Sequence, residues 1–293
     1  MALAGICWGT IGIFLTTLGD KGFTQIQLAV YRTGVAAIIV ALIALIKDRK
    51  LFKFRIKDFW IFIGTGLVST LMLNVCYFYS IEHTSLSVAA VLLYTSPVFI
   101  MLLSALFFKE KLTGRKLASL PITIVGCLCV TGLLDGGGTT VSAKGIAVGI
   151  CSGLAYALYS IFGRCALDRG YHPITVSLYT LILATLGGIP FSDITETFPL
   201  IDSVSSVAFI ALFGFVCSAL PFLFYTKGLE GVENSKAAII ATVEPVTATV
   251  VGVGIYHEEM TFFKAVGILL IFVSIVVINV NFSKKISRGE GTR

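Results

Sequence analysis

Two ionisable residues lie inside long apolar stretches of this sequence, and they are the first candidates for chemistry. Glu244 lies about ten residues into the apolar stretch 234–255, and Arg32 about six residues into the stretch 26–46. An ionisable side chain at mid-membrane costs about 2.5 to 3.5 kcal/mol on insertion scales. We interpret Glu244 as a carboxylate that binds a substrate ammonium group or a proton, with a structural clamp beside Pro245 as the alternative. For Arg32 a structural role is favoured, because an arginine this shallow can snorkel or bind loop carbonyls.

Polar and aromatic side chains within the other apolar stretches are further candidates for ligand contact. An aromatic ring can stack on a small organic molecule, and an indole, amide or hydroxyl group can hydrogen-bond to it. Packing remains the alternative for each of them. With the two ionisable residues, the candidates for a substrate cavity are Trp8, Arg32, Asn74, Tyr77, Tyr94, Ser96, Tyr156 and Glu244.

Two prolines interrupt apolar stretches at corresponding places. Pro97 lies in the stretch 86–107 and Pro245 in the stretch 234–255. Each removes a backbone N–H and favours a kink. We expect these prolines to act as hinges or to shape a cavity, and a purely architectural kink is the alternative.

The elements that must position these residues are membrane-spanning helices. The sequence is 56% hydrophobic and 13% charged, with a mean hydropathy of +0.95, whereas soluble domains carry about 25% charged residues. A helix needs about 20 mostly apolar residues to cross a bilayer. The stretches that meet this need are 2–18, 26–46, 58–79, 86–107, 116–134, 145–166, 173–192, 205–226, 234–255 and 263–282. We therefore predict an all-α integral membrane fold of ten transmembrane helices, the first of them retained rather than cleaved as a signal peptide.

Metal and cofactor chemistry has little support in the sequence. His83, His172 and His257 are scattered over loop regions and form no ligand cluster. The 7 cysteines lie in or beside apolar stretches without paired ligand spacing, so we interpret them as packing residues. No phosphate-binding loop of the Walker type occurs. We expect no cofactor and no metal.

The basic residues indicate topology rather than a nucleic-acid partner. Most of the 22 Lys and Arg residues fall in alternate loops, including the segments 47–57 and 109–116 and the tail. Because loops rich in Lys and Arg stay on the cytoplasmic side, both termini are predicted to be cytoplasmic. The expected partners are a lipid bilayer and a small-molecule substrate. No nucleic-acid binding is expected, and the chain is expected to be a monomer or a weak homodimer.

The sequence repeats itself at a constant offset. The matching pairs are Gly66 with Gly214, Tyr77 with Tyr225, Pro97 with Pro245, Glu110 with Glu258, Thr113 with Thr261 and Lys116 with Lys264. A second match, at an offset of 144 residues, aligns Gly5 and Gly9 with Gly149 and Gly153. Both glycine pairs have the small-xxx-small spacing that lets helix backbones approach closely. The offset of the first set of pairs, 148 residues, also aligns Ser96 with Glu244, so the two copies differ at a candidate cavity position.

The repeat predicts two halves of opposite orientation. Each half holds five spans, an odd number, so the second copy enters the membrane from the other side. We expect a first five-helix repeat at 1–134, a linker loop at 135–144, a second repeat at 145–283 and a cytoplasmic tail at 284–293. Near-equivalent inverted halves could expose one central cavity to each side in turn.

The motifs of both halves resemble those of the drug/metabolite transporter superfamily, in particular its ten-helix EamA-type exporters. The resemblance covers essentially the whole chain. It rests on Cys7-Trp8-Gly9-Thr10, Tyr31-Arg32-Thr33-Gly34, Ser96-Pro97, the segment 107–113, Glu244-Pro245-Val246, the segment 256–261 and Gly267. The resemblance implies an alternating-access carrier of small metabolites, often an exporter of amino acids or drugs, in the plasma membrane, here the cytoplasmic membrane of a bacterium.

The sequence therefore favours a secondary active or facilitative transporter and not an enzyme. The alternatives are an integral-membrane enzyme that acts on a lipid-linked substrate, and a channel. The enzyme would need a cluster of acids or a metal site at one membrane interface. The channel would need a filter-like loop. Neither pattern is found in the loops of this sequence.

Overall fold

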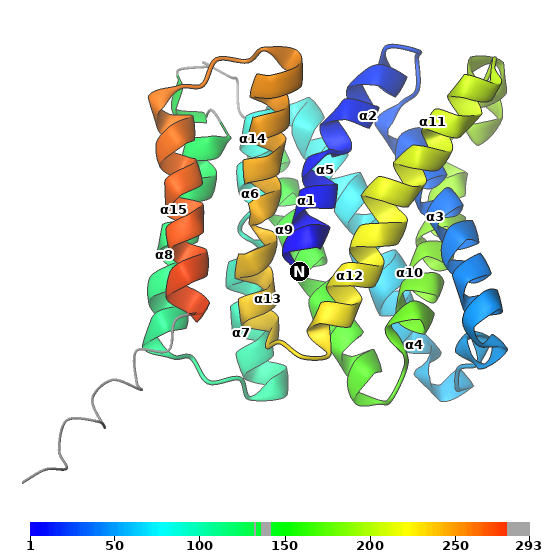
Figure 1. Ribbon diagram of the computed structural model, residues 1–293, viewed down its shortest axis with the longest axis horizontal. Coiled ribbons are helices and arrows are strands. Elements are labelled where there is room, and N and C mark those ends of the chain that lie inside the picture. Colours follow the sequence, from blue (N-terminus) through cyan, green and yellow to red (C-terminus); the bar gives the residue numbers. More distant parts are fainter. Residues whose placement is uncertain (132, 136–141, 280–293) are drawn as a thin grey trace, which may run out of the picture.

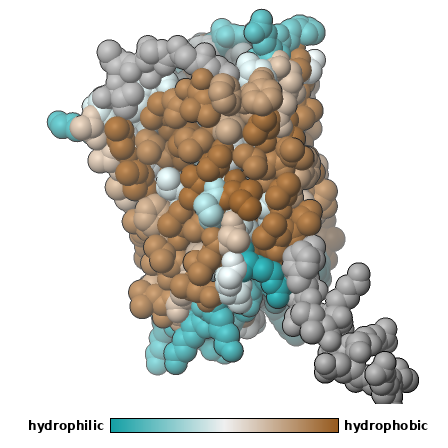
Figure 2. Space-filling view, turned by 90° about the vertical axis from the view of Figure 1, so that its left-hand side faces the viewer, coloured by the Kyte–Doolittle hydropathy of each residue, from teal (hydrophilic) through white to brown (hydrophobic). Residues whose placement is uncertain are grey.

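The chain folds into a bundle of helices that stand side by side (Figure 1). This computed structural model describes residues 1–131, 133–135 and 142–279, and these residues contain no strand. The expected tail 284–293 and most of the expected linker 135–144 lie outside the described residues. On the face shown in Figure 2, mostly apolar residues occupy the middle, and hydrophilic residues gather at both ends.

The described residues hold nine helical segments that are long and apolar enough to cross a membrane. They are Ala2–Gly19, Gln25–Lys47, Ile56–His83, Leu86–Phe108, Ala143–Asp168, Pro173–Phe191, Val204–Leu229, Asn234–Tyr256 and Phe262–Asn279. Each lies close to a stretch expected from hydropathy. The remaining expected stretch, 116–134, corresponds to helix α8 (Gly114–Val130), which has 17 residues. The all-helical membrane fold is confirmed at this level.

Several of these segments consist of more than one helix. The helices that form them are α1 (Ala2–Gly9), α2 (Ile11–Gly19), α3 (Gln25–Lys47), α4 (Phe59–Ile63), α5 (Met72–His83), α6 (Leu86–Leu93), α7 (Ser96–Phe108), α9 (Ala143–Asp168), α10 (Pro173–Gly188), α11 (Val204–Gly214), α12 (Leu220–Leu229), α13 (Asn234–Ala241), α14 (Val243–Tyr256) and α15 (Phe262–Asn279).

Side chains at the helix ends explain where individual helices begin. Thr24 precedes α3, where its hydroxyl accepts a hydrogen bond from the Gln27 N–H and the Gln27 side chain accepts one from the Thr24 N–H at 2.8 Å. This capping box satisfies N–H groups that have no partner within the helix. Thr113 caps α8 with a single hydrogen bond, which its hydroxyl accepts from the Lys116 N–H.

Breaks divide two spans immediately before the expected hinge prolines. The chain leaves the α-helix at Tyr94 and Thr95, and α7 resumes with Pro97 in its first turn. The second break lies at Thr242, between α13 and α14, and Pro245 follows it. A proline lacks the N–H that would continue the helical ladder but fits the first turn of a new helix. The prolines therefore restart helices after a break rather than kink continuous ones.

Two further spans contain π-helical turns. Gly64–Leu71 lies between α4 and α5, and Phe215–Ala219 lies between α11 and α12. In the first of them the Thr70 hydroxyl donates to the Thr65 carbonyl oxygen at 2.8 Å, five residues earlier. Such turns are uncommon in helices and are frequent at functional sites. Hydropathy carries no sign of them.

Helices from the first part of the chain pack mainly on helices from the second part. The most extensive pairings are α8 with α15, α5 with α9, α3 with α10 and α1 with α14. The largest buried apolar cluster draws on α1, α3, α10, α12 and α13. The two parts therefore share one core.

The approach of α1 to α14 depends on glycine. A Cβ atom added at Gly9 would lie 2.5 Å from the Thr247 Cβ and 2.6 Å from the Glu244 carbonyl oxygen. Gly153 has the matching relation to α6 and the break after it, where an added Cβ would lie 2.8 Å from the Leu92 carbonyl oxygen. The predicted packing of the two glycine pairs is thus seen at both sites, next to the two helix breaks.

We expect Gly9→Ala to destabilise the protein by about 1 to 3 kcal/mol, the range for overfilling a packed site. The added methyl group meets backbone, which cannot rotate away. Gly12→Ala is the matched control, because an added Cβ there meets nothing within 4 Å. It should change the stability by less than about 1 kcal/mol. Thermal unfolding in one detergent measures both, and equal stability of the two variants would contradict the packing argument.

Candidate functional site

A cavity of about 1080 Å³ lies between the helices and gathers most of the candidate residues. It is lined by residues of α1, α2, α3, α5, α6, α8, α9, α12, α14 and α15. At one end its lining includes the exposed residues Asp20, Gln25 and Glu258, together with Ser87 and Lys264. We call this end the mouth. It lies at the upper end of Figure 1, where α2 ends and α14 passes into α15.

Arg32 is buried in the cavity wall. Its side chain is 9% exposed, and Nη2 donates a hydrogen bond to Asn74 Oδ1 at 2.7 Å. The Asn74 amide in turn donates to the Thr70 carbonyl oxygen at 2.6 Å. Thr70 belongs to the π-helical turn, so this irregular turn helps to position the Asn74 side chain. We expected a loop carbonyl or the membrane surface as the partner of Arg32, and the structure shows the Asn74 amide instead.

Glu244 lines the same cavity and stands in the first turn of α14. The N–H groups of a first helical turn favour a negative charge. Within the described residues, no hydrogen bond or ion pair holds its carboxylate. Arg32 and Glu244 line the same cavity, from α3 and α14. Besides the charged residues at the mouth, the cavity wall therefore carries the Glu244 carboxylate and the Arg32 guanidinium group.

Aromatic rings surround Trp8 at one part of the wall. The Trp8 ring centroid lies 5.6 Å from that of Tyr225, 6.1 Å from Tyr156 and 6.0 Å from Phe222. The Tyr225 hydroxyl shares a hydrogen bond with Ser160 Oγ at 2.8 Å, which anchors the ring on α9. Aromatic faces attract cations as well as apolar groups. This cluster, with the two charges, suits a small organic molecule that carries an ammonium group.

The structure brings most of the predicted site residues together. The residues at the cavity wall are Trp8, Arg32, Asn74, Tyr77, Tyr94, Tyr156, Glu244 and Pro245. Ser96 and Pro97 are buried at the start of α7 and, in the described part of the chain, are not among the lining residues. Sequence reasoning did not select Tyr159 and Phe222, which also line the wall. Hydropathy does not distinguish an aromatic residue that faces the cavity from one that packs against a neighbouring helix.

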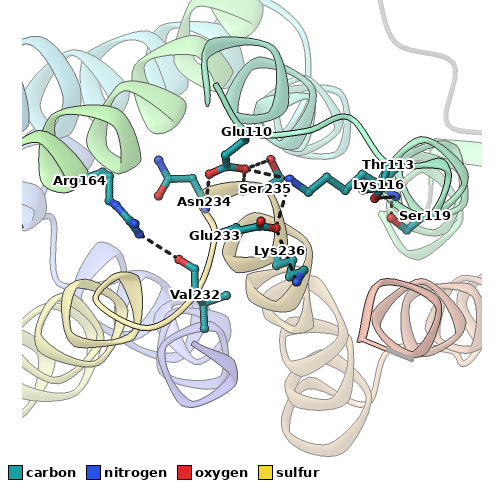
Figure 3. A network of polar contacts seen from close by, with 10 residues as sticks. All are labelled: Glu110, Thr113, Lys116, Ser119, Arg164, Val232, Glu233, Asn234, Ser235 and Lys236. Carbon is teal, nitrogen blue, oxygen red and sulfur yellow. Dashed lines mark hydrogen bonds and ion pairs between the residues drawn. The ribbon is translucent and has the colours of Figure 1, made fainter. Parts of the chain in front are cut away.

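The opposite end of the molecule is tied together by a polar network around Glu110 (Figure 3). Glu110 Oε1 accepts from the Asn234 N–H at 2.8 Å, and Oε2 accepts from Ser235 Oγ at 2.6 Å. Lys116 is 1% exposed and pairs with Glu110 at 3.1 Å and with Glu233 at 3.2 Å. We call these five residues the Glu110 network. It joins the segment after α7 and the start of α8 to the start of α13.

The charge state of Glu110 follows from these contacts. Burial by itself would raise the pKa of its carboxyl group, but the hydrogen bonds from Ser235 and Lys116 outweigh burial and lower the pKa. Glu110 is therefore ionised at neutral pH. Sequence reasoning treated Lys116 as a loop residue that sets topology, whereas the structure shows a buried cation between two carboxylates. The doubled pairs Glu110 with Lys116 and Glu258 with Lys264 were the signal that could have revealed it.

Arg164 adds a second tie at this end. Its Nη1 donates to the Leu229 carbonyl oxygen at 2.8 Å and to the Val232 carbonyl oxygen at 3.3 Å. These contacts hold the turn between α12 and α13 against α9, on the other side of the network in Figure 3. The cavity is thus open at the mouth, while the end that carries the basic loops is held closed.

Comparison with known proteins agrees with this architecture. The model of the EamA-like transporter family matches residues 1–132 and 143–280. An uncharacterized transporter of Archaeoglobus fulgidus is 25% identical over 94% of each chain. The uncharacterized transporter YyaM of Bacillus subtilis is 21% identical over 87% of this chain and 84% of its own. The uncharacterized inner membrane transporter YicL of Salmonella typhimurium is 23% identical over 97% of this chain and 95% of its own.

A solved crystal structure has the same fold. It superposes with a TM-score of 0.79, is 17% identical in sequence and covers 94% of both chains. At this identity the likeness extends to the fold alone. It shows that the helical arrangement described above exists in another protein.

Proposed function

This chain belongs to the EamA-like transporter family and is a multi-pass membrane transporter, and from that premise we propose that it carries small organic metabolites by alternating access through the cavity. The observation that carries the proposal is the cavity itself, which opens at the mouth, while its described lining includes no residue of the opposite end, where the Glu110 network ties the helices together. A carrier needs a site that is open to one side at a time. Its volume of about 1080 Å³ suits a small ligand.

The proposal includes ten transmembrane helices in two inverted repeats. α8 counts as the tenth span, because its 17 residues lie at the lower limit of about 17 to 25 for crossing a bilayer. The match of one family model to residues 1–132 and to residues 143–280 supports the duplication. The end with the basic loops is assigned to the cytoplasm by the positive-inside rule. Both termini are then cytoplasmic, in a bacterial cytoplasmic membrane, and the mouth faces outward.

The substrate class follows from the groups at the cavity wall. Glu244 offers a carboxylate to an ammonium group, the rings around Trp8 offer aromatic faces to the same group, and Arg32 offers a guanidinium group to an anion. We therefore assign amines and amino-acid-like zwitterions as substrates, ahead of neutral sugars and nucleosides. Transport would be secondary active or facilitative, in the direction that the gradients set.

Counterflow in proteoliposomes tests this function. Vesicles preloaded with an unlabelled substrate should take up the labelled form at least tenfold faster than empty vesicles, because a carrier returns faster when loaded. Amino acids and amines should show this exchange, and sugars and nucleosides should not. Flux without acceleration by substrate on the far side would indicate a channel. Conversion of an added lipid-linked compound, without any exchange, would favour the membrane enzyme instead.

A further inference from the structure

The contacts that close one end of the cavity depend on a local structure that occurs twice in the chain. Lys109 and His257 both adopt the left-handed conformation, with φ 54° and ψ 32° in the first and φ 54° and ψ 31° in the second. The next residue of each copy returns its N–H to the preceding helix, from Glu110 to the Ser104 carbonyl oxygen and from Glu258 to the Gly252 carbonyl oxygen.

The two copies also share their ion pair. Lys116 Nζ donates to Glu110 Oε2 at 3.1 Å, and Lys264 Nζ donates to Glu258 Oε2 at 2.9 Å. Glu110 and Glu258 are therefore held by the same turn and the same lysine, one at each end of the molecule. The same ion pair is thus present at both ends of the molecule.

What differs between the copies is the third partner. Glu110 accepts hydrogen bonds from the N–H groups of Asn234 and Ser235 and from the Ser235 hydroxyl, all at the start of α13. Glu258 has a 53% exposed side chain, and within the described residues its carboxylate accepts a hydrogen bond only from Lys264. At the offset that aligns Glu110 with Glu258, the start of α13 corresponds to Leu86 and Ser87 at the start of α6.

The start of α6 is ready to receive a carboxylate. Leu86, Ser87, Glu258 and Lys264 all line the mouth of the cavity. The first N–H groups of a helix have no partner within it. Ser85 caps only the Val88 N–H, so in the described structure the N–H groups of Leu86 and Ser87 have no recorded protein acceptor.

We infer that Glu258 is the latch that closes the mouth, in contact with the start of α6. In the closed state its carboxylate accepts hydrogen bonds from the N–H groups of Leu86 and Ser87 and from the Ser87 hydroxyl, as Glu110 does now with α13. The inference rests on the proposed alternating access and names the residues that perform it. In each state one glutamate binds both its lysine and the start of a helix in the other half, and the other glutamate binds its lysine alone.

The two latches differ in strength, which accounts for the state described here. Lys116 pairs with two carboxylates, those of Glu110 and Glu233, and both it and Glu110 are largely buried. Ser85 occupies the position in the other copy that corresponds to Glu233. In a closed mouth Lys264 would therefore pair with one carboxylate, that of Glu258. The Glu110 latch is therefore the stronger one, and the resting protein keeps the mouth open.

Chemical cross-linking of the full chain in proteoliposomes tests the contact. A short, reducible bis-methanethiosulfonate should join the cysteines of the double variant Ser87→Cys/Glu258→Cys, because it traps each visit to the closed state. Mass spectrometry of the linked peptides separates this bond from reactions of the native cysteines. Ser87→Cys/Glu259→Cys is the matched control, one residue further along the loop, and should link at least tenfold less. Glu110→Cys/Ser235→Cys calibrates the reagent on the contact that exists now.

The function of the carboxylate is tested separately. Glu258→Gln should slow counterflow at least threefold, because the closed mouth loses its charged acceptor, while Glu259→Gln should leave the rate unchanged. The contact would be overturned if the Ser87→Cys/Glu258→Cys variant linked no better than the Ser87→Cys/Glu259→Cys variant while the Glu110→Cys/Ser235→Cys pair linked. An unchanged rate in Glu258→Gln would overturn the latch. Either of these negative results leaves counterflow by the unmodified protein intact. If the unmodified protein itself showed no counterflow, the carrier proposal would be contradicted.

Discussion

Glu244→Gln is expected to lower the rate of counterflow about tenfold to hundredfold while the protein remains folded. A hydrogen bond to a charged group contributes about 1.5 to 3 kcal/mol, and each 1.4 kcal/mol corresponds to about a tenfold change in affinity. Glu244 lines the cavity and is held by no described side chain, so its charge is available to a substrate ammonium group or a proton. Glutamine keeps the size of the side chain and removes the charge.

The measurement is the initial rate of counterflow in proteoliposomes as a function of substrate concentration and pH. Size-exclusion profiles and thermal unfolding verify that the variant is folded. Glu259→Gln is the matched control, since it makes the same change at an exposed position in the loop after α14. Transport and pH dependence equal to those of the unmodified protein would remove Glu244 from the substrate site.

Lys116→Met should destabilise the protein by about 3 kcal/mol. Removing one partner of a buried ion pair costs about 3 to 5 kcal/mol, because the other charge stays buried without compensation. We take the lower end of that range, since Glu233 is 47% exposed and can turn toward water. Methionine fills much of the space of the lysine side chain. The loss of stability therefore measures the effect of removing the charge rather than the effect of creating a cavity.

The repeat provides the control for this change. Lys264 forms the corresponding pair, but it is 14% exposed and its partner Glu258 is 53% exposed. Lys264→Met should therefore cost less than about 1 kcal/mol, the range of exposed ion pairs. At about 2 °C per kcal/mol, Lys116→Met should lower the unfolding midpoint by at least about 6 °C. Equal shifts in the two variants would mean that the Glu110 network does not hold its end of the molecule closed.

The helical spans were predictable because hydropathy is a local property. The expected stretch 26–46 became Gln25–Lys47, and the expected 234–255 became Asn234–Tyr256. Both limits are set by nearby residues, such as the capping Thr24. Interruptions within the spans were only partly predictable. Proline marked the breaks near Pro97 and Pro245, whereas the π-helical turns depend on contacts with neighbouring helices and have no local signal.

The candidate site was predictable where a residue is costly to bury. Arg32 and Glu244 stand out because a charge inside an apolar stretch is costly to insert into a membrane unless it has a partner or a function. Both residues line the cavity. Tyr159 and Phe222 do not stand out, because aromatic residues are common in apolar helices. Ser96 was selected for its match to Glu244 in the repeat, but α7 turns it into the packed interior.

Hydropathy and residue matches were enough to predict that the chain lies in a membrane, where its helices run and which residues recur along it. These follow from the transfer of each segment into lipid and from direct comparison of residues. Only the tertiary structure decided that Lys116 is buried, that aromatic rings gather around Trp8 and that one end of the cavity is closed while the other is open. Those features depend on partners far apart in the sequence, such as Glu110 with Ser235, and the contacts between such partners are set by the packing of the helices.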